Sequence, residues 1–183
     1  MVKIGVVYFS GTGTTAKLAQ AVIEGADTAG AEVLDLPIVG DDIVGGRWSN
    51  DALAEHLDNC DAIILGTPTY MGSISGQMKS FIDAMAPRWF SQVWKDKIAS
   101  AFTASSLASG NKSSTFSGLA TFAMQMGMIW YGTGGSFSDG VNPNGFYFGA
   151  GATASAPDQL TEFDLHTARH LGVRVTELAV KLA

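Results

Sequence analysis

The chain has 183 residues, 46% of them hydrophobic and 15% charged, and its formal net charge is −6 at pH 7. This length suits a single domain over residues 1–183 with a sizeable buried core, and the acidic balance argues against nucleic-acid binding, which needs clustered positive charge. The one cysteine, Cys60, excludes an internal disulfide and fits a reducing cytoplasm, and no apolar run is long enough to predict a membrane span.

The first predicted strand, Val2–Phe9, is nearly all apolar, as in a parallel sheet covered on both faces. The sequence Ser10-Gly11-Thr12-Gly13-Thr14-Thr15 follows it, and helical spacing predicts a helix from about Thr15 to Ala29. Strand, tight glycine turn and helix start together predict an anion site, because glycines allow close approach and the first N–H groups of a helix lack internal partners.

The residues of this turn favour one kind of phosphate. The loop has no Gly-Lys-Ser/Thr, so it is not a Walker A loop, although Gly11, Gly13 and Ala16 satisfy a loose dinucleotide pattern. A terminal phosphate has three oxygens to satisfy, and the surrounding hydroxyls can do so. We therefore expect a mononucleotide phosphate, with a dinucleotide or an ordinary strand-to-helix turn as alternatives.

The following elements alternate between strands and helices. Trp48 lies in a Gly- and Asp-rich loop, where it is expected either to plug the core or to contact a partner. The predicted elements are strand Glu32–Leu36, loop Val39–Asn50, helix Asp51 to about Leu57, strand Asp61–Gly66, helix Ser75–Ala84, strand Ile98–Thr103, helix Ser113–Gly127, strand Met128–Tyr131 and helix Gln159–Lys181. This alternation predicts an α/β doubly wound, five-stranded parallel sheet in the order 2-1-3-4-5, with helices on both faces.

In such a sheet the ligand lies outside the carboxyl ends of the strands, where the strand order reverses. The loops after the first and third strands flank that point, so the phosphate loop and Thr67-Pro68-Thr69-Tyr70 are expected to meet. Pro68 stiffens the second loop, Gly72 allows close backbone approach, and Tyr70 and Met71 offer apolar surface to a planar heterocycle.

These motifs resemble those of the flavodoxin-like proteins, whose FMN signature matches Ser10 to Thr15. The stretch Gly66-Thr67-Pro68-Thr69-Tyr70-Met71-Gly72-Ser73-Ile74-Ser75-Gly76-Gln77-Met78-Lys79 is similar to the WrbA type of NAD(P)H:quinone oxidoreductase. The resemblance implies a cytoplasmic flavoprotein in which flavin N5, and no protein side chain, carries the chemistry. NADH or NADPH would reduce FMN, which would pass two electrons to a quinone or another small acceptor.

The third loop, Ala104–Asn111, leaves the next strand beside the same edge. Its small residues would let backbone N–H groups stabilise negative charge on the reduced ring. Together the loops give these expected FMN-binding residues: Ser10, Thr12, Gly13, Thr14, Thr15, Pro68, Thr69, Tyr70, Met71, Gly72, Thr103, Ala104, Ser105, Ser106 and Gly110.

The resemblance also implies a substrate side formed by Trp89, Met126 and Tyr147, and a homo-oligomer, a tetramer or a dimer. Trp89 matches a tryptophan near the flavin of a neighbouring subunit, with ordinary core packing as the alternative. Tyr147 matches a Pro-Tyr-Gly-Ala element. The long stretch 132–158 is expected to be irregular. Our hypothesis is that it acts as a lid and subunit contact that shapes the substrate side, and the alternative is a plain surface loop.

This chain departs from the WrbA pattern in two places. Gln125-Met126 replace a histidine pair, and the third loop is rich in Ser and Ala rather than in Gly and Thr. The alternatives are therefore a one-electron flavodoxin shuttle that docks a redox protein partner, and a non-enzymatic FMN-binding interaction protein. No site for a metal is expected, since His166 and His170 have no third ligand nearby.

Overall fold

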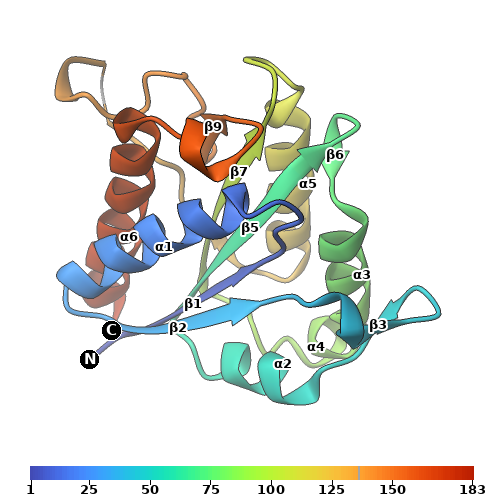
Figure 1. Cartoon of the computed structure of the whole chain (residues 1–183). Coiled ribbons are helices and arrows are strands. Elements are labelled where there is room, and N and C mark those ends of the chain that lie inside the picture. Colours follow the sequence, from blue (N-terminus) through green and yellow to red (C-terminus); the bar gives the residue numbers. More distant parts are fainter. Residues whose placement is uncertain (136) are drawn as a thin grey trace.

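The computed structural model describes residues 1–135 and 137–183, and its elements are arranged around a twisted parallel sheet (Figure 1). The central order is β2-β1-β5-β7, and β8 and β9 share the edge beyond β7. The strands of this sheet are β1 (Lys3–Tyr8), β2 (Glu32–Pro37), β5 (Ala62–Tyr70), β7 (Ile98–Ser105), β8 (Ile129–Trp130) and β9 (Ala150–Thr153). The expected order 2-1-3-4-5 is confirmed, with β5, β7 and β8 as its third to fifth strands.

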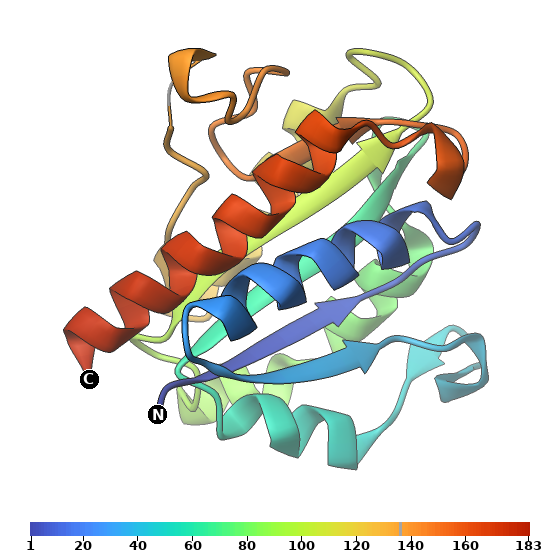
Figure 2. The same cartoon turned by 60° about the vertical axis from the view of Figure 1, so that its left-hand side comes forward.

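Helices cover both faces of the sheet, as right-handed crossovers require (Figure 2). On one face α1 (Thr14–Thr28) and α6 (Glu162–Leu182) lie side by side. The other face carries α2 (Asp51–Asp58), α3 (Gly76–Ala84) and α5 (Lys112–Gln125), and α4 (Ala86–Ser91) continues from α3. None of the helices in the described part of the chain is both long and apolar enough to cross a membrane.

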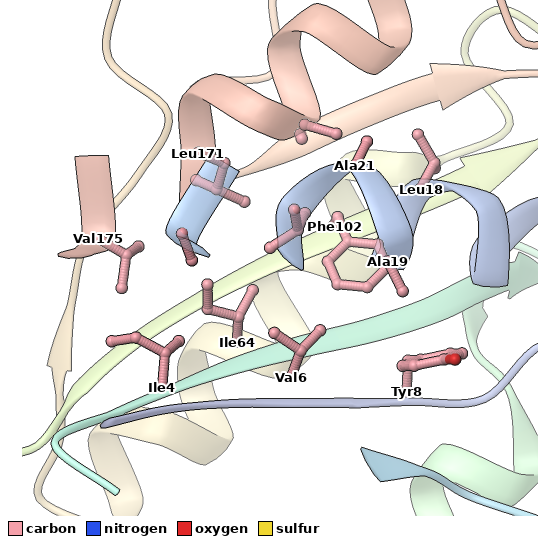
Figure 3. Packing of buried hydrophobic residues seen from close by; sticks show 14 of the residues in the cluster. Ile4, Val6, Tyr8, Leu18, Ala19, Ala21, Ile64, Phe102, Leu171 and Val175 are labelled. Atoms are coloured by element: carbon pink, nitrogen blue, oxygen red, sulfur yellow. The ribbon is translucent and has the colours of Figure 1, made fainter. Parts of the chain in front are cut away.

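Two apolar clusters hold the layers together, one on each face of the sheet. Ile4, Val6 and Tyr8 of β1 face α1 and α6, and Leu18 and Leu171 pack against them from the two helices (Figure 3). The alternate residue Val7 belongs to the other cluster. Because both faces are covered, the central strands carry apolar runs such as Ile4–Tyr8 of β1 and Ala62–Leu65 of β5.

Two segments that were expected to be loops contain strands. β5 continues through Thr67-Pro68-Thr69-Tyr70, turns at Met71-Gly72 and pairs antiparallel with β6 (Ser73–Ile74). Both turn residues have positive φ, 48° and 75°, as a two-residue hairpin turn needs. The stretch 39–50 likewise holds η1 (Gly40–Asp42) and a hairpin of β3 (Ile43–Val44) and β4 (Arg47–Trp48). Trp48 is buried and its ring meets that of Phe81, which confirms it as a plug over the core.

The stretch 132–158 is not irregular throughout. It contains β9, η2 (Phe137–Asp139) and η3 (Pro157–Gln159), while Ser136 lies outside the described residues. β8 pairs with the start of β7 and β9 pairs with its end, so the edge strand is interrupted between its two halves. After η3, α6 begins at Glu162 rather than at Gln159, because Thr161 and Asp164 form a capping box there.

Candidate functional site

The carboxyl ends of β1, β5 and β7 meet around a cavity of about 120 Å³. Three separate segments of the chain therefore converge at the edge of the sheet where the strand order reverses. The lining residues are Gly11, Thr12, Thr14, Thr15, Pro68, Thr69, Tyr70, Ala104, Ser105, Ser106, Ala154 and Ser155. The cavity is smaller than the roughly 300–1,000 Å³ of pockets that enclose a drug-sized ligand, so a larger ligand would extend over its rim.

The first segment turns from β1 into α1 through a left-handed residue, Gly13, whose φ is 92°. The hydroxyl oxygen of Ser10 accepts hydrogen bonds from the N–H groups of Gly13 and Ala16, both at 3.1 Å. Ser10 thus holds the loop in shape and keeps its own O–H free to donate. Within the described chain, the N–H groups of Thr12, Thr14 and Thr15 donate no hydrogen bond.

The hydroxyl oxygens of Thr12 and Thr14 lie 3.5 Å apart, so these two side chains converge. The Oη atom of Tyr70 lies so near Gly11 that a Cβ at that position would be 2.4 Å from it. Unpartnered N–H groups, converging hydroxyls and the positive end of α1 are features that favour binding of an anion.

The second segment is fixed by a network of buried hydroxyls behind the cavity. The Thr69 hydroxyl lies 2.9 Å from that of Thr103 and 2.8 Å from that of Thr115, which links β5, β7 and α5. Thr103 also donates to the carbonyl of Thr67 at 2.6 Å. Thr103, expected to touch the ligand, therefore has its hydroxyl engaged in this network and does not line the cavity.

We expect Thr103→Val to lower the free energy of unfolding of the ligand-free protein by about 2 kcal/mol, because buried partners lose their hydrogen bonds. Urea unfolding would measure the change. Thr121→Val is the matched control: this exposed hydroxyl bonds only to Ser117 O within α5, and its loss should change stability by less than about 0.5 kcal/mol. Equal effects of the two variants would contradict the role of the network.

The third segment follows β7 and returns into α5 through Gly110 and Asn111, both with positive φ. The Ser105 hydroxyl donates to the carbonyl of Leu107 at 2.8 Å. A Cβ on Gly110 would lie 2.1 Å from Ser105 Oγ, so the loop can close over Ser105 only with glycine there. Gly110 therefore shapes the loop and does not line the cavity.

A buried lysine, which the sequence reading missed, ties this loop to β9. Lys112 is 0% exposed, and its ammonium donates to Ser105 Oγ, Leu107 O and Ala108 O, each at 2.9 Å, and to Thr153 Oγ1 at 3.2 Å. Burial lowers the pKa of Lys112, and the negative charge of Asp164 partly opposes this. No local pattern marks this residue, because a lysine at the start of a helix is ordinarily solvated.

Other residues expected at the site have different surroundings. Met71 is fully exposed at the tip of the β5–β6 hairpin, and a Cβ on Gly72 would be 3.0 Å from the side-chain nitrogen of Asn111. Ala154 and Ser155, beyond β9, line the cavity although the sequence reading did not single them out.

The expected substrate-side residues lie elsewhere in the chain. Trp89 and Met126 line a second cavity of about 160 Å³, formed by the carboxyl-terminal ends of α3 and α5 together with α4. Met126 lies at the opposite end of α5 from Lys112, which contacts the third loop. The length of α5 puts these two residues roughly 20 Å apart, at 1.5 Å per residue. Tyr147 is exposed in the segment between β8 and β9, and its carbonyl accepts from Thr133 N. One chain alone does not bring these three residues to the cavity of the phosphate loop.

The lining residues of the first cavity are suited to binding a ligand and not to general acid–base catalysis. Tyr70 is the only one of them with an ionisable side chain. Tyr8 lies two residues before the loop. Burial is the main cause that raises the pKa of Tyr8 to about 12, and its hydroxyl is protonated at neutral pH. Hydroxyls and N–H groups around an anion site, with the ring of Tyr70 at the rim, fit a phosphorylated, flat ligand that brings its own chemistry.

Comparisons with known proteins agree with this arrangement. The family model described as NADPH-dependent FMN reductase matches residues 2–141. The flavodoxin FldP of Pseudomonas aeruginosa is 33% identical over 192 residues, which cover 100% of this chain and 99% of that protein. An NAD(P)H dehydrogenase (quinone) of Sinorhizobium fredii is 34% identical over 199 residues, with 100% of both chains covered. The crystal structure of a WrbA-like flavodoxin from Agrobacterium tumefaciens has a TM-score of 0.79 and 37% identity, with 99% of each chain covered.

Proposed function

We propose that this chain, which belongs to the NADPH-dependent FMN reductase family, takes electrons from NADH or NADPH and passes two of them to a quinone. The chain is an FMN-dependent oxidoreductase of the flavodoxin-like, WrbA-type group. One observation carries the assignment of the site: unpartnered N–H groups and hydroxyls of the phosphate loop face the same cavity as the ends of β5 and β7.

In this proposal residues 1–183 form a single FMN-binding domain. The phosphate of FMN lies against the N–H groups of Thr12, Thr14 and Thr15, and the Ser10 hydroxyl donates to it. The segment around Pro68–Tyr70 supports one side of the ring and Ala104–Ser106 the other. The ring extends over the rim, since the cavity holds only part of such a ligand.

Bound FMN supplies the redox chemistry at ring atom N5, and the protein binds and orients it. The chain's own residues exclude water behind the site, where Thr69, Thr103 and Thr115 are buried and bonded to each other. A one-electron flavodoxin shuttle with a redox protein partner is the second candidate, because a relative called a flavodoxin is as similar as one called a quinone dehydrogenase.

Anaerobic titration of the FMN-loaded protein separates the two candidates. For the reductase, NADPH or NADH alone should remove the visible absorbance of the flavin at one equivalent per FMN, and a quinone should restore it. For the shuttle, neither nicotinamide should act, while dithionite should reduce the flavin. A protein that takes up no FMN would contradict both candidates.

We also propose that a second copy of the chain completes the substrate side. The second cavity combines the exposed ring of Trp89 with buried Met126, so a neighbouring subunit could bring these residues to the flavin of the first. A tetramer or dimer in sedimentation experiments is expected, and Trp89→Ala should raise the KM for quinone while leaving FMN binding unchanged. A monomer with full quinone turnover would contradict this part.

The single buried thiol, Cys60, agrees with a cytoplasmic location.

A further inference from the structure

The side chain of Lys112 poses an energetic problem. It is fully buried, yet no ion pair to it is found among residues 1–135 and 137–183. Its partners are four neutral oxygens, and the ring of Phe146 lies 5.2 Å from Nζ. Burying an unpaired charge is costly even when hydrogen bonds satisfy its donors.

The position in the helix adds to that cost. Lys112 is the first residue of α5, whose first turn holds no acidic residue. The amino-terminal end of a helix carries partial positive charge and disfavours a cation. Asp164 has a buried carboxylate, but its oxygens accept from Thr161 and Asn144 instead. Folding alone therefore does not explain a positive charge here.

The cation lies directly behind the wall of the FMN cavity. Ser105 accepts a hydrogen bond from Lys112 and also lines that cavity, and Thr153 immediately precedes the lining residues Ala154 and Ser155. An anionic ligand in the cavity would thus be separated from the ammonium by one layer of side chains. At such distances, and with protein between them, opposite charges attract appreciably.

Lys112 also orients the peptide groups of the third loop. The carbonyls of Leu107 and Ala108 point at the ammonium. In a planar trans peptide the N–H group points opposite to the carbonyl, so the N–H groups of Ala108 and Ser109 point away from Lys112. Neither N–H donates to another group in the part of the chain that the structure describes. Ala108 and Ser109 do not line the cavity, so these two donors are available to the part of a ligand that extends over its rim.

From this geometry we infer that Lys112 is a positioning residue that favours the reduced, negatively charged ring of FMN over the oxidised ring. The ammonium supplies the opposite charge, and the carbonyls it holds turn two N–H groups outward. Two-electron reduction with uptake of one proton leaves the ring with one negative charge, which the oxidised ring lacks. The inference rests on the proposed FMN function of the same cavity.

Two different substitutions cancel the positive charge at Lys112, one by deleting the ammonium and one by adding a carboxylate beside it. Lys112→Met keeps a long apolar side chain without the ammonium, and Lys112→Arg keeps the charge as its control. Should Lys112→Met fail to fold, Thr153→Asp places a carboxylate beside the existing ammonium, and Thr153→Asn is its neutral control. For each folded variant, the affinity for oxidised FMN and the two-electron midpoint potential of the bound flavin are measured.

We expect Lys112→Met and Thr153→Asp to weaken binding of reduced FMN about tenfold more than binding of oxidised FMN. That ratio lowers the midpoint potential by about 30 mV for a two-electron couple. The controls should keep the potential of the natural protein. An unchanged potential with equal loss of affinity for both redox forms would overturn the inference, since Lys112 would then only fasten the loop.

Two further outcomes are distinguishable. Weaker binding of FMN in both redox forms, with riboflavin unaffected, would show that the cation acts on the phosphate, and it would also overturn the inference. Failure of the natural protein to bind FMN at all would overturn the proposed function and this inference together. A midpoint potential that falls in Lys112→Met and Thr153→Asp, but not in their controls, supports the proposed function and the inference about Lys112.

Discussion

Replacing Thr12 and Thr14 together by valine is expected to raise the Kd for FMN about 100-fold. The two hydroxyls converge at 3.5 Å on the cavity where we place the phosphate. A hydrogen bond to a charged group contributes about 1.5–3 kcal/mol, and the loss of two amounts to at least about 3 kcal/mol. Quenching of flavin fluorescence on binding would measure the Kd.

Riboflavin provides the ligand control, because it has the same ring and lacks the phosphate. Its affinity should be the same for the double variant and for the natural protein. Thr28→Val is the protein control, since this hydroxyl bonds to Glu24 O at the far end of α1. Similar losses for riboflavin and FMN would show that the valines disturb the ring site instead of the phosphate site.

The second large effect is expected where α1 crosses α6. A Cβ on Gly172 would lie 2.1 Å from Val22 O and 2.8 Å from Ala26 N, and one on Gly25 would lie 2.0 Å from Arg169 O. These are backbone atoms, so the helices themselves must move apart to admit a methyl group. We expect Gly172→Ala to lower the free energy of unfolding by about 3 kcal/mol.

Gly76→Ala is the control for this substitution. Gly76 is also a helical glycine, but a Cβ there would meet no atom of another element within 4 Å, and alanine favours the helix by up to about 1 kcal/mol. Urea unfolding of both ligand-free variants gives the comparison. If Gly172→Ala were as stable as Gly76→Ala, the close approach of α1 and α6 would be wrong.

The parallel sheet and the phosphate loop could be predicted because their signals are local. Val2–Phe9 is a continuous apolar run, and the hydroxyls and glycines between Ser10 and Thr15 form one short motif. The convergence of the three loops followed from the strand order alone. These parts of the molecule follow from local sequence patterns and strand order, without any long-range side-chain contact.

Other features could not be read from local patterns. β9 consists of Ala150-Gly151-Ala152-Thr153, and its first three residues are of types that are depleted in strands. A Cβ on Gly151 would lie 2.4 Å from the ring of Phe146, and one on Gly149, just before β9, would lie 2.1 Å from Ala101 O of β7. Only the folded chain brings these atoms together. The extension of β5 through Pro68 was missed for a different reason: proline has no N–H to donate to a neighbouring strand, so it argues against a central strand.

Lys112 illustrates the same limit at the site. Its four oxygen partners come from residues 105, 107, 108 and 153, so the last of them is far away in the sequence. Substrate-side Trp89 and Met126 raise a different question, because within one chain they share a separate cavity. In our proposal they reach the flavin only in an assembly of several copies, which the sequence of one chain does not describe.

A crystal structure of the protein with FMN would test the central claim most directly. We expect the phosphate within hydrogen-bonding distance of the N–H groups of Thr12, Thr14 and Thr15, and the ring between Tyr70 and the third loop. A flavin whose phosphate lies away from this turn would contradict the assignment of the site and the redox function derived from it.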